Sequence, residues 1–187
     1  SIGGVGLIKD YKKMITMDFK EIDNIVLVIG KTEGHIDQSL FARNILDEKN
    51  GPPPEINLFN EKNNGETLLK LIDSGYIKSA HDVSLGGIVT SLSKMCIKGK
   101  KGLTLKKTNH LTNQFEYFFG EDQGRYIVEI NKDDLKAIIE ILDKNSVHYD
   151  ELGVINKKEL IFDEKTKVTI DELTLSNTSW LINYMSK

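Results

Sequence analysis

The sequence is poor in cysteine and proline, and it has no long apolar run. Its single cysteine, Cys96, can form neither an internal disulfide nor a cysteine-based zinc site within this chain. A reducing compartment is therefore expected, and with it a cytoplasmic location. Cys96 falls within a helical pattern, which favours a small packed hydrophobe over a nucleophile. No apolar run approaches the roughly 20 residues that a membrane-spanning helix needs, so we expect no membrane partner.

A strong charge of one sign is also missing. The formal net charge is -3, and charged residues make up 28% of the chain beside 39% hydrophobic residues. This composition is typical of a globular protein without a general attraction to nucleic acid or anionic lipid. The 187 residues fit a single domain. Because the first residue is Ser1, we expect residues 1–187 to be one domain cut from a longer polypeptide, able to carry half of a site.

Strand-like and helix-like stretches alternate along the chain. β-Branched or alternating runs predict strands at 24–30, 76–82, 103–105, 125–130 and 148–155, and a hairpin over 159–170. Apolar spacing predicts helices at 37–46, 60–74, 88–96 and 132–145, and a last helix that begins within 169–171. This order predicts an α+β fold in α/β/α layers, in which helices pack on a mixed β-sheet.

Two of these stretches carry a more specific expectation. The lysine-rich segment 98–107 has no interleaved aromatic residues, which favours a solvated edge strand over a nucleic-acid patch. The last helix is expected to direct its apolar side chains towards the core: Leu173, Leu175, Trp180, Leu181 and Ile182.

The segment "AHDVSLGG", residues 80–87, joins a predicted strand to a predicted helix. Asp82 at the end of the strand could bind magnesium, which prefers oxygen ligands. Gly86 and Gly87 would expose the backbone amides of the helix start to an anion. The alternative is that Asp82 or Ser84 caps the helix and the glycines allow close packing, and spacing alone favours it. His81 is expected to be a hydrogen-bonded structural residue.

The segment "FFGEDQGRYIV", residues 118–128, places three polar side chains between two glycines and an arginine directly after the second, just before a strand. Glu121 and Gln123 could bind hydroxyl or amide groups, and Arg125 could bind a phosphate or carboxylate. Asp122 belongs to the same group. The alternative is a polar turn in which Arg125 pairs with a neighbouring acid, and the residues alone do not decide between the two.

The remaining candidate stretches lack the pattern of a known site. The glycine-containing loop 30–39 has neither the ending nor the spacing of a phosphate loop, so a surface or interface loop is expected. His35, His110 and His148 have no partners at zinc-ligand spacing. The nucleophile elbow of serine hydrolases is also missing.

Together the segments 118–128 and "SAHDVSLGGIVTSLSKM", with "IGGVGLI" near the start and "GPPPEINLFNEKNNGETLLKLIDSG", resemble a known family. They look like the C-terminal region of the synthetase subunit of phosphoribosylformylglycinamidine synthase, which is also called formylglycinamide ribonucleotide amidotransferase. Within that subunit the chain resembles the last C-terminal domain of the aminoimidazole ribonucleotide synthetase type.

The resemblance implies an enzyme of purine biosynthesis, a carbon–nitrogen ligase that uses ATP and Mg²⁺. In the family, ATP activates the amide oxygen of formylglycinamide ribonucleotide, and ammonia from glutamine then displaces phosphate to give the amidine. The implied partners are the N-terminal domains of the same subunit, a glutaminase subunit and a small accessory subunit. We expect the isolated chain to be inactive, because the clefts of the family are shared between domains.

The resemblance also assigns roles to residues. Asp82 matches the metal-binding acid of the family's "HDxSxGG" motif, and Ser84, Gly86 and Gly87 match its nucleotide or phosphate contacts. Glu121, Asp122, Gln123 and Arg125 match a substrate-binding segment. No histidine here inherits the catalytic role. Leu85 stands where the family commonly has aspartate and Asp37 where a glycine is usual, which argues against a complete metal cluster.

Two other interpretations remain open at this stage. The domain could be structural, with glycine loops that serve packing and polar turns that contact neighbouring domains. It could also belong to another ATP-dependent enzyme of the same superfamily, such as aminoimidazole ribonucleotide synthetase, selenophosphate synthetase or thiamine-phosphate kinase. The segments 120–126 and 51–55 together favour the amidotransferase.

Overall fold

The computed structural model describes residues 3–106 and 113–186. Its strands are β1 (Ile25–Ile29), β2 (Ile77–Asp82), β3 (Gly102–Leu105), β4 (Tyr126–Ile130), β5 (Tyr149–Asn156), β6 (Glu159–Ile161) and β7 (Lys167–Thr169). Its α-helices are α1 (Leu40–Asn44), α2 (Leu58–Asp73), α3 (Gly87–Gly99), α4 (Gln114–Phe119), α5 (Leu135–Lys144) and α6 (Ile170–Met185). Single 3-10 turns cover Tyr11–Lys13 and Lys132–Asp134.

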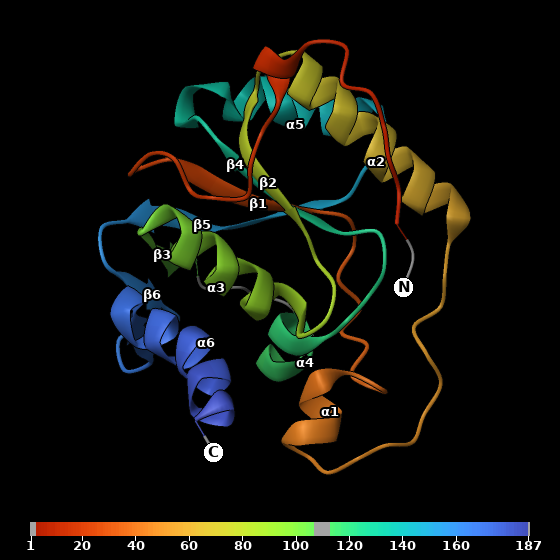
Figure 1. Cartoon of the computed structure of the whole chain (residues 1–187). Helices are drawn as coiled ribbons and strands as arrows, with labels where there is room; N and C mark the ends of the chain where they lie inside the picture. The colour runs from red at the N-terminus through yellow and green to blue at the C-terminus, as the bar shows by residue number, and fades with distance from the viewer. Residues whose placement is uncertain (1–2, 107–112, 187) are drawn as a thin grey trace.

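The strands form one mixed sheet in the order β2-β4-β1-β5-β3-β6-β7 (Figure 1). β3 and β6 run parallel, whereas the other neighbouring strands are antiparallel. β1 lies inside the sheet between β4 and β5, and its five residues are all buried, as its β-branched run predicted. The α+β fold, with helices packed on a mixed sheet, is therefore confirmed.

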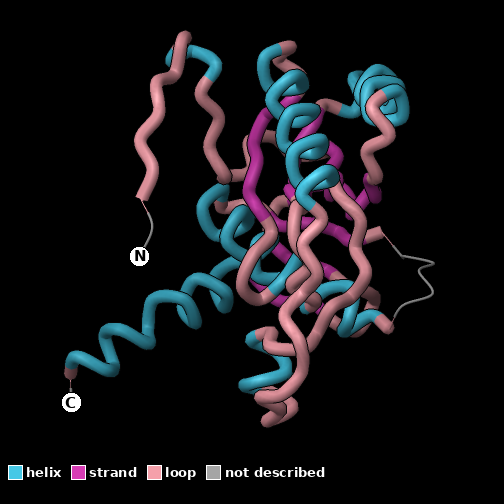
Figure 2. Tube along the Cα trace, turned by 90° about the vertical axis from the view of Figure 1, so that its right-hand side faces the viewer, coloured by secondary structure: helices cyan, strands magenta, loops and turns pink. Residues whose placement is uncertain are grey.

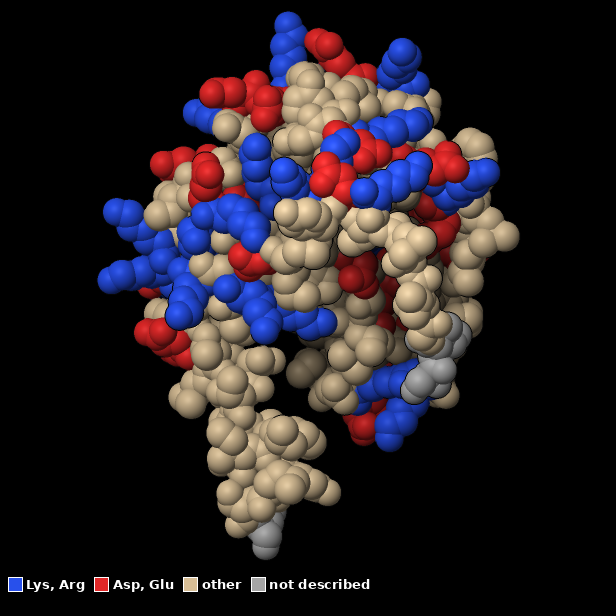
Figure 3. Space-filling view, turned by 45° about the horizontal axis from the view of Figure 1, so that its top comes forward, with Lys and Arg blue, Asp and Glu red and all other residues tan. Residues whose placement is uncertain are grey.

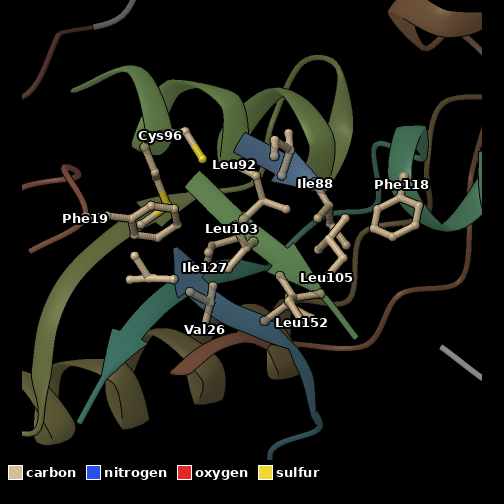
Figure 4. Packing of buried hydrophobic residues seen from close by; sticks show 14 of the residues in the cluster. Phe19, Val26, Ile88, Leu92, Cys96, Leu103, Leu105, Phe118, Ile127 and Leu152 are labelled. Atoms are coloured by element: carbon tan, nitrogen blue, oxygen red, sulfur yellow. The ribbon is translucent and has the colours of Figure 1, made fainter. Parts of the chain in front are cut away.

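Helices cover both faces of the sheet and create two apolar cores. Val26 and Val28 of β1 point towards α3 and α4, whereas Ile25, Leu27 and Ile29 point towards α2 and α5. Figure 4 shows the first core, in which Ile88, Leu92 and Cys96 of α3 pack on the sheet. The Cys96 side chain is buried, as predicted, and the loss of water around it raises the pKa of the thiol to about 12.

The prediction of an edge strand within 98–107 is wrong. β3 lies between β5 and β6, and the β6–β7 hairpin extends the sheet beyond it. Leu103 and Leu105 are buried in the first core, while Thr104 is exposed. The lysines flank the strand rather than interrupt it, so its backbone is free to pair on both sides. Lys107 and the nearby His110 lie outside the described residues.

The helix expected at 37–46 is much shorter in the structure. α1 begins after Ser39, whose hydroxyl accepts from the Ala42 N–H, and it ends at Asn44. The left-handed backbone of Gln38 (φ 62°) and of Asp47 (φ 55°) limits the helix at both ends. By contrast, the helix expected at 60–74 is present as α2.

The last helix forms, but its predicted direction towards the core is wrong beyond its first turn. Thr169 and Glu172 make a reciprocal capping box that fixes its start. Leu173 packs against the first core. The other four predicted core residues are exposed by more than half: Leu175, Trp180, Leu181 and Ile182. α6 leaves the body of the molecule after this first contact (Figure 2), so its later side chains reach no core.

Candidate functional site

Three segments with unusual backbone meet at one end of the sheet. We call residues 30–36 the first glycine loop, residues 83–87 the second glycine loop and residues 120–125 the acidic turn. The acidic turn contacts both loops, because its own hydrogen-bond acceptors receive backbone N–H groups from each of them.

The second glycine loop brings β2 to the start of α3. Gly86 (φ 83°) and Gly87 (φ 68°) both have left-handed backbone, which disfavours other residues. A Cβ atom on Gly87 would lie 2.7 Å from the carbonyl oxygens of Phe118 and Gly120, so this glycine also permits a close approach of α4. Gly86 is the N-cap of α3 and makes no side-chain cap hydrogen bond. The capping role considered for Asp82 or Ser84 is therefore wrong.

Glu121 supplies an anion at the start of α3. Its Oε1 atom accepts from the Gly86 N–H at 2.8 Å and from the Leu40 N–H at 2.7 Å, at the first residue of α1. A negative charge is favoured at a helix N-terminus, because the backbone amides there lack partners within the helix. The position that a phosphate could take at Gly86 is thus held by a carboxylate of the chain itself.

Asp122 fills the first glycine loop in the same way. Its carboxylate accepts from three consecutive backbone N–H groups, those of Glu33 (3.1 Å), Gly34 (3.0 Å) and His35 (2.9 Å). Consecutive amides of this kind form an anion-binding concavity. The loop was predicted to be a surface or interface loop, and its alternation of glycine and polar residues gave no sign of this internal ligand.

Arg125 holds the acidic turn together from inside. Its side chain is fully buried and donates from Nη2 to the Gly120 carbonyl (2.7 Å) and from Nε to the Asp122 carbonyl (3.1 Å). Nη1 donates to Thr32 Oγ1 (3.1 Å) and lies 3.5 Å from the Asp122 carboxylate. Burial lowers the pKa of Arg125 and the Asp122 charge opposes that change, so the group remains a cation. The pairing with a neighbouring acid is therefore present.

The side chain of Asp82 takes no part in the hydrogen bonds of the acidic turn, although Val83 next to it donates its N–H to the Arg125 carbonyl. Its side chain is 63% exposed and lines a hollow of about 320 Å³ with Met17, Ala80, His81 and Tyr126. His81 Nδ1 lies 3.0 Å from Asp82 Oδ1, as expected of a hydrogen-bonded structural residue, while its buried Nε2 has no partner. Within residues 3–106 and 113–186, no three or more histidine, cysteine or acidic side chains form a metal-binding group.

A larger polar groove, of about 1000 Å³, lies on the other side of the acidic turn. Gln123 lines it together with the first glycine loop and residues 54–64, which include the start of α2. Asn64 of α2 closes its floor, because Nδ2 donates to the Gly124 carbonyl at 2.9 Å. No motif marks Asn64, although an asparagine on the buried face of an amphipathic helix indicates a polar contact within the protein.

The predicted site residues therefore do not form one site. Glu121 and Gly86 bind each other, and Asp122 and Arg125 are used within the fold. Asp82 and Gln123 line two different hollows. Ser84 is exposed, and Gly87 is buried against α4.

A family model, curated sequences and solved structures each match this chain. Residues 21–165 match the family of AIR synthase related proteins, C-terminal domain. The subunit PurL of phosphoribosylformylglycinamidine synthase from Pelagibacter ubique is 75% identical over 185 residues, which is 99% of this chain and 25% of that protein. The chain thus spans about a quarter of the length of the curated relatives it matches.

Solved structures of Thermotoga maritima PurL share the fold at 17% sequence identity. The structure complexed with FGAR has a TM-score of 0.72 over 87% of this chain and 30% of that chain. The structure complexed with ATP has a TM-score of 0.66 over 87% of this chain and 27% of that chain. Because the family model covers residues 21–165, which is more than half of the chain, the chain belongs to the family of AIR synthase related C-terminal domains.

Proposed function

We propose that this chain is the C-terminal domain of the synthetase subunit of phosphoribosylformylglycinamidine synthase. The whole subunit would convert formylglycinamide ribonucleotide to its amidine in the cytoplasm, with ATP as the activating reagent and glutamine as the source of ammonia. The observation that carries the proposal is the 75% identity to the Pelagibacter ubique subunit over 99% of the chain.

We assign the chain one wall of a nucleotide cleft. Asp82 is the residue that would bind Mg²⁺, and its exposure leaves room for the phosphates and waters that magnesium usually keeps as ligands. Because Asp82 is the one carboxylate of residues 80–87, the remaining ligands would come from the nucleotide, water and other domains. The hydroxyl of Ser84, which is exposed beside it, would contact phosphate. Bound Mg²⁺ would neutralise phosphate charge.

Glu121 of the acidic turn restricts how a phosphate could bind in this cleft. A phosphate that bound the Gly86 N–H would compete with the Glu121 carboxylate, which already accepts from it. Gly86 and Gly87 would therefore bind a nucleotide only if Glu121 moved. Among the predicted substrate contacts, Gln123 is the side chain that faces open space, whereas Asp122 and Arg125 would act by fixing the backbone that carries it.

The test is a chimeric subunit, in which this chain replaces the corresponding quarter of the Pelagibacter ubique protein. We expect the chimera, with the glutaminase and accessory subunits, to form the amidine in the presence of Mg²⁺ and ATP. Asp82→Ala should weaken Mg²⁺-dependent ATP binding about tenfold or more, since a magnesium ligand would be lost. Asp73→Ala, which removes an exposed acid of α2, is the matched control.

Two results would contradict the proposal. A correctly folded chimera without activity would remove the assignment to this enzyme. An unchanged affinity for Mg²⁺ and ATP in Asp82→Ala, with only its stability altered, would favour the second candidate, a structural domain without a ligand. One observation favours that candidate: the Glu121 and Asp122 carboxylates already accept backbone N–H groups of the two glycine loops.

A further inference from the structure

The last eleven residues of α6, 175–185, project from the molecule without a covering element in the described chain. Ile170 and Leu173 at the start of the helix pack against the first core. Beyond them, Leu175, Trp180 and Ile182 are 65–67% exposed, and Leu181, Tyr184 and Met185 are 58–74% exposed. Figure 2 shows the helix extending away from the sheet to the end of the chain. An isolated helix of this length has little stability in water, because most helical stability comes from packing.

The exposed apolar side chains lie on opposite sides of the helix instead of forming one stripe. Leu175 and Ile182 are seven residues apart and share a face. Trp180 and Tyr184 are four residues apart, and their rings stack at 5.3 Å on the opposite side. Ser176, Ser179 and Asn183 share a third side, so the helix is apolar on two opposite sides and polar between them. Apolar side chains on opposite sides of one helix need cover from more than one direction. The described residues contain no helix long and apolar enough to cross a membrane.

Charge is also missing from this part of the helix. Residues 173–186 contain no charged side chain, and in Figure 3 the projecting helix is free of blue and red. Charged residues are depleted at the centres of protein interfaces, where desolvating them is costly. On the same side of the molecule as the end of α6, the N-terminal segment exposes Val5 and Leu7 almost completely (Figure 2).

We infer that α6 from Leu175 to Met185 is the surface that docks this domain against the other three quarters of its subunit. The inference rests on the proposed function, because that function supplies the missing polypeptide: relatives are about four times as long as this chain. A second copy of the chain would cover this surface less well. A helix pair related by a two-fold axis buries one stripe on each helix, and here opposite faces both need cover.

The test compares the isolated chain with the chimeric subunit by hydroxyl-radical footprinting and mass spectrometry, without ATP or Mg²⁺. Trp180 and Met185 should be oxidised about tenfold more slowly in the chimera, because a covered side chain is inaccessible to the radical. Equal oxidation of both residues in the two proteins would overturn the inference. Protection that appears in the isolated chain as its concentration rises would also overturn it, in favour of a second copy.

A set of substitutions tests the two faces separately. Ile182→Glu and Tyr184→Glu should each lower the thermal midpoint of the chimera and leave that of the isolated chain unchanged. The matched control is Leu69→Glu, at a leucine of α2 that is 62% exposed, and it should change neither midpoint. An effect from only one of the two α6 substitutions would contradict cover on both sides. Oxidation rates and thermal midpoints do not depend on catalysis. An inactive chimera in which α6 is protected would therefore contradict the proposed function but not the docking of α6.

Discussion

The acidic turn and the end of α6 differ in whether their side chains find partners within the described chain. In the acidic turn, two carboxylates and a guanidinium find partners among backbone amides, carbonyls and one another. In the second half of α6, large apolar side chains find no partner within the described chain. The first region is complete by itself, whereas the second would be completed, on the inference above, by the rest of the subunit.

This difference shows how the domain divides its tasks. Polar groups buried without partners are costly, so the turn that shapes the two glycine loops must be satisfied before any ligand arrives. Apolar surface can remain exposed in an isolated domain and contribute its free energy later, when a partner covers it. The turn therefore belongs to the folding of the domain, whereas α6 would, on the inference above, contribute when the subunit assembles.

The largest expected effect is at Arg125. Arg125→Met should lower the free energy of unfolding by about 3–5 kcal/mol, because the Asp122 carboxylate loses its buried counter-charge and two buried carbonyl groups lose their donor. Urea denaturation of the isolated chain measures this change. Arg43→Met, at an exposed arginine of α1, should cost less than about 0.5 kcal/mol. A loss at Arg125 as small as that at Arg43 would show that the turn is not held from inside.

Asp122 should have the next largest effect. Asp122→Ala removes the acceptor for the N–H groups of three residues of the first glycine loop and should cost about 2–3 kcal/mol. Asp122→Asn retains one acceptor oxygen and should cost about half as much. Hydrogen exchange of the amides of residues 33–35 should accelerate in both variants. Unchanged exchange in Asp122→Ala would mean that the loop does not depend on this carboxylate.

Removing the Glu121 carboxylate should have a smaller effect on stability and a distinct effect on binding. Glu121→Ala should cost about 1 kcal/mol, since the amides of Leu40 and Gly86 can be hydrated once the side chain is gone. With the carboxylate removed, inorganic phosphate should shift the NMR amide resonance of Gly86. The wild-type chain is the control and should show no such shift. A Gly86 resonance that responds equally in both proteins would contradict the internal occupancy of this position.

The smallest effect is expected at the end of α6. Trp180→Ala in the isolated chain should change the free energy of unfolding by less than about 0.5 kcal/mol, because the indole is 67% exposed and contacts mainly Tyr184. Chemical denaturation followed by circular dichroism would measure it. A loss above about 1.5 kcal/mol would mean that α6 packs on the domain in solution, and the contrast with the acidic turn would disappear.

Local patterns predicted most of the elements, for reasons that can be identified. The β-branched run of β1 and the helical spacing of Ile88, Leu92 and Cys96 each report burial directly. The place of β3 inside the sheet was beyond such patterns, because the strand's neighbours are far away in the sequence. The direction of α6 was misjudged for a related reason: an apolar helix has the same pattern whether its cover lies in this chain or in another polypeptide.

In the candidate site, too, local patterns predicted the residue types but not their partners. The sequence indicated that glycines, acids and Arg125 gather at two loops, since those residue types are needed for tight turns and anion contacts. It could not indicate that Glu121 and Asp122 themselves fill the loops, because those contacts join residues about 35 and 88 positions apart.

By itself, the sequence determined the alternation of strands and helices, the two apolar faces of β1 and the chemical types present in the acidic turn. Only the tertiary structure decided which partner each polar group took and which apolar helix was left uncovered. The physical reason is that propensity and periodicity act over a few neighbouring residues, whereas hydrogen bonding in a turn and burial of a helix depend on distant segments that meet in space.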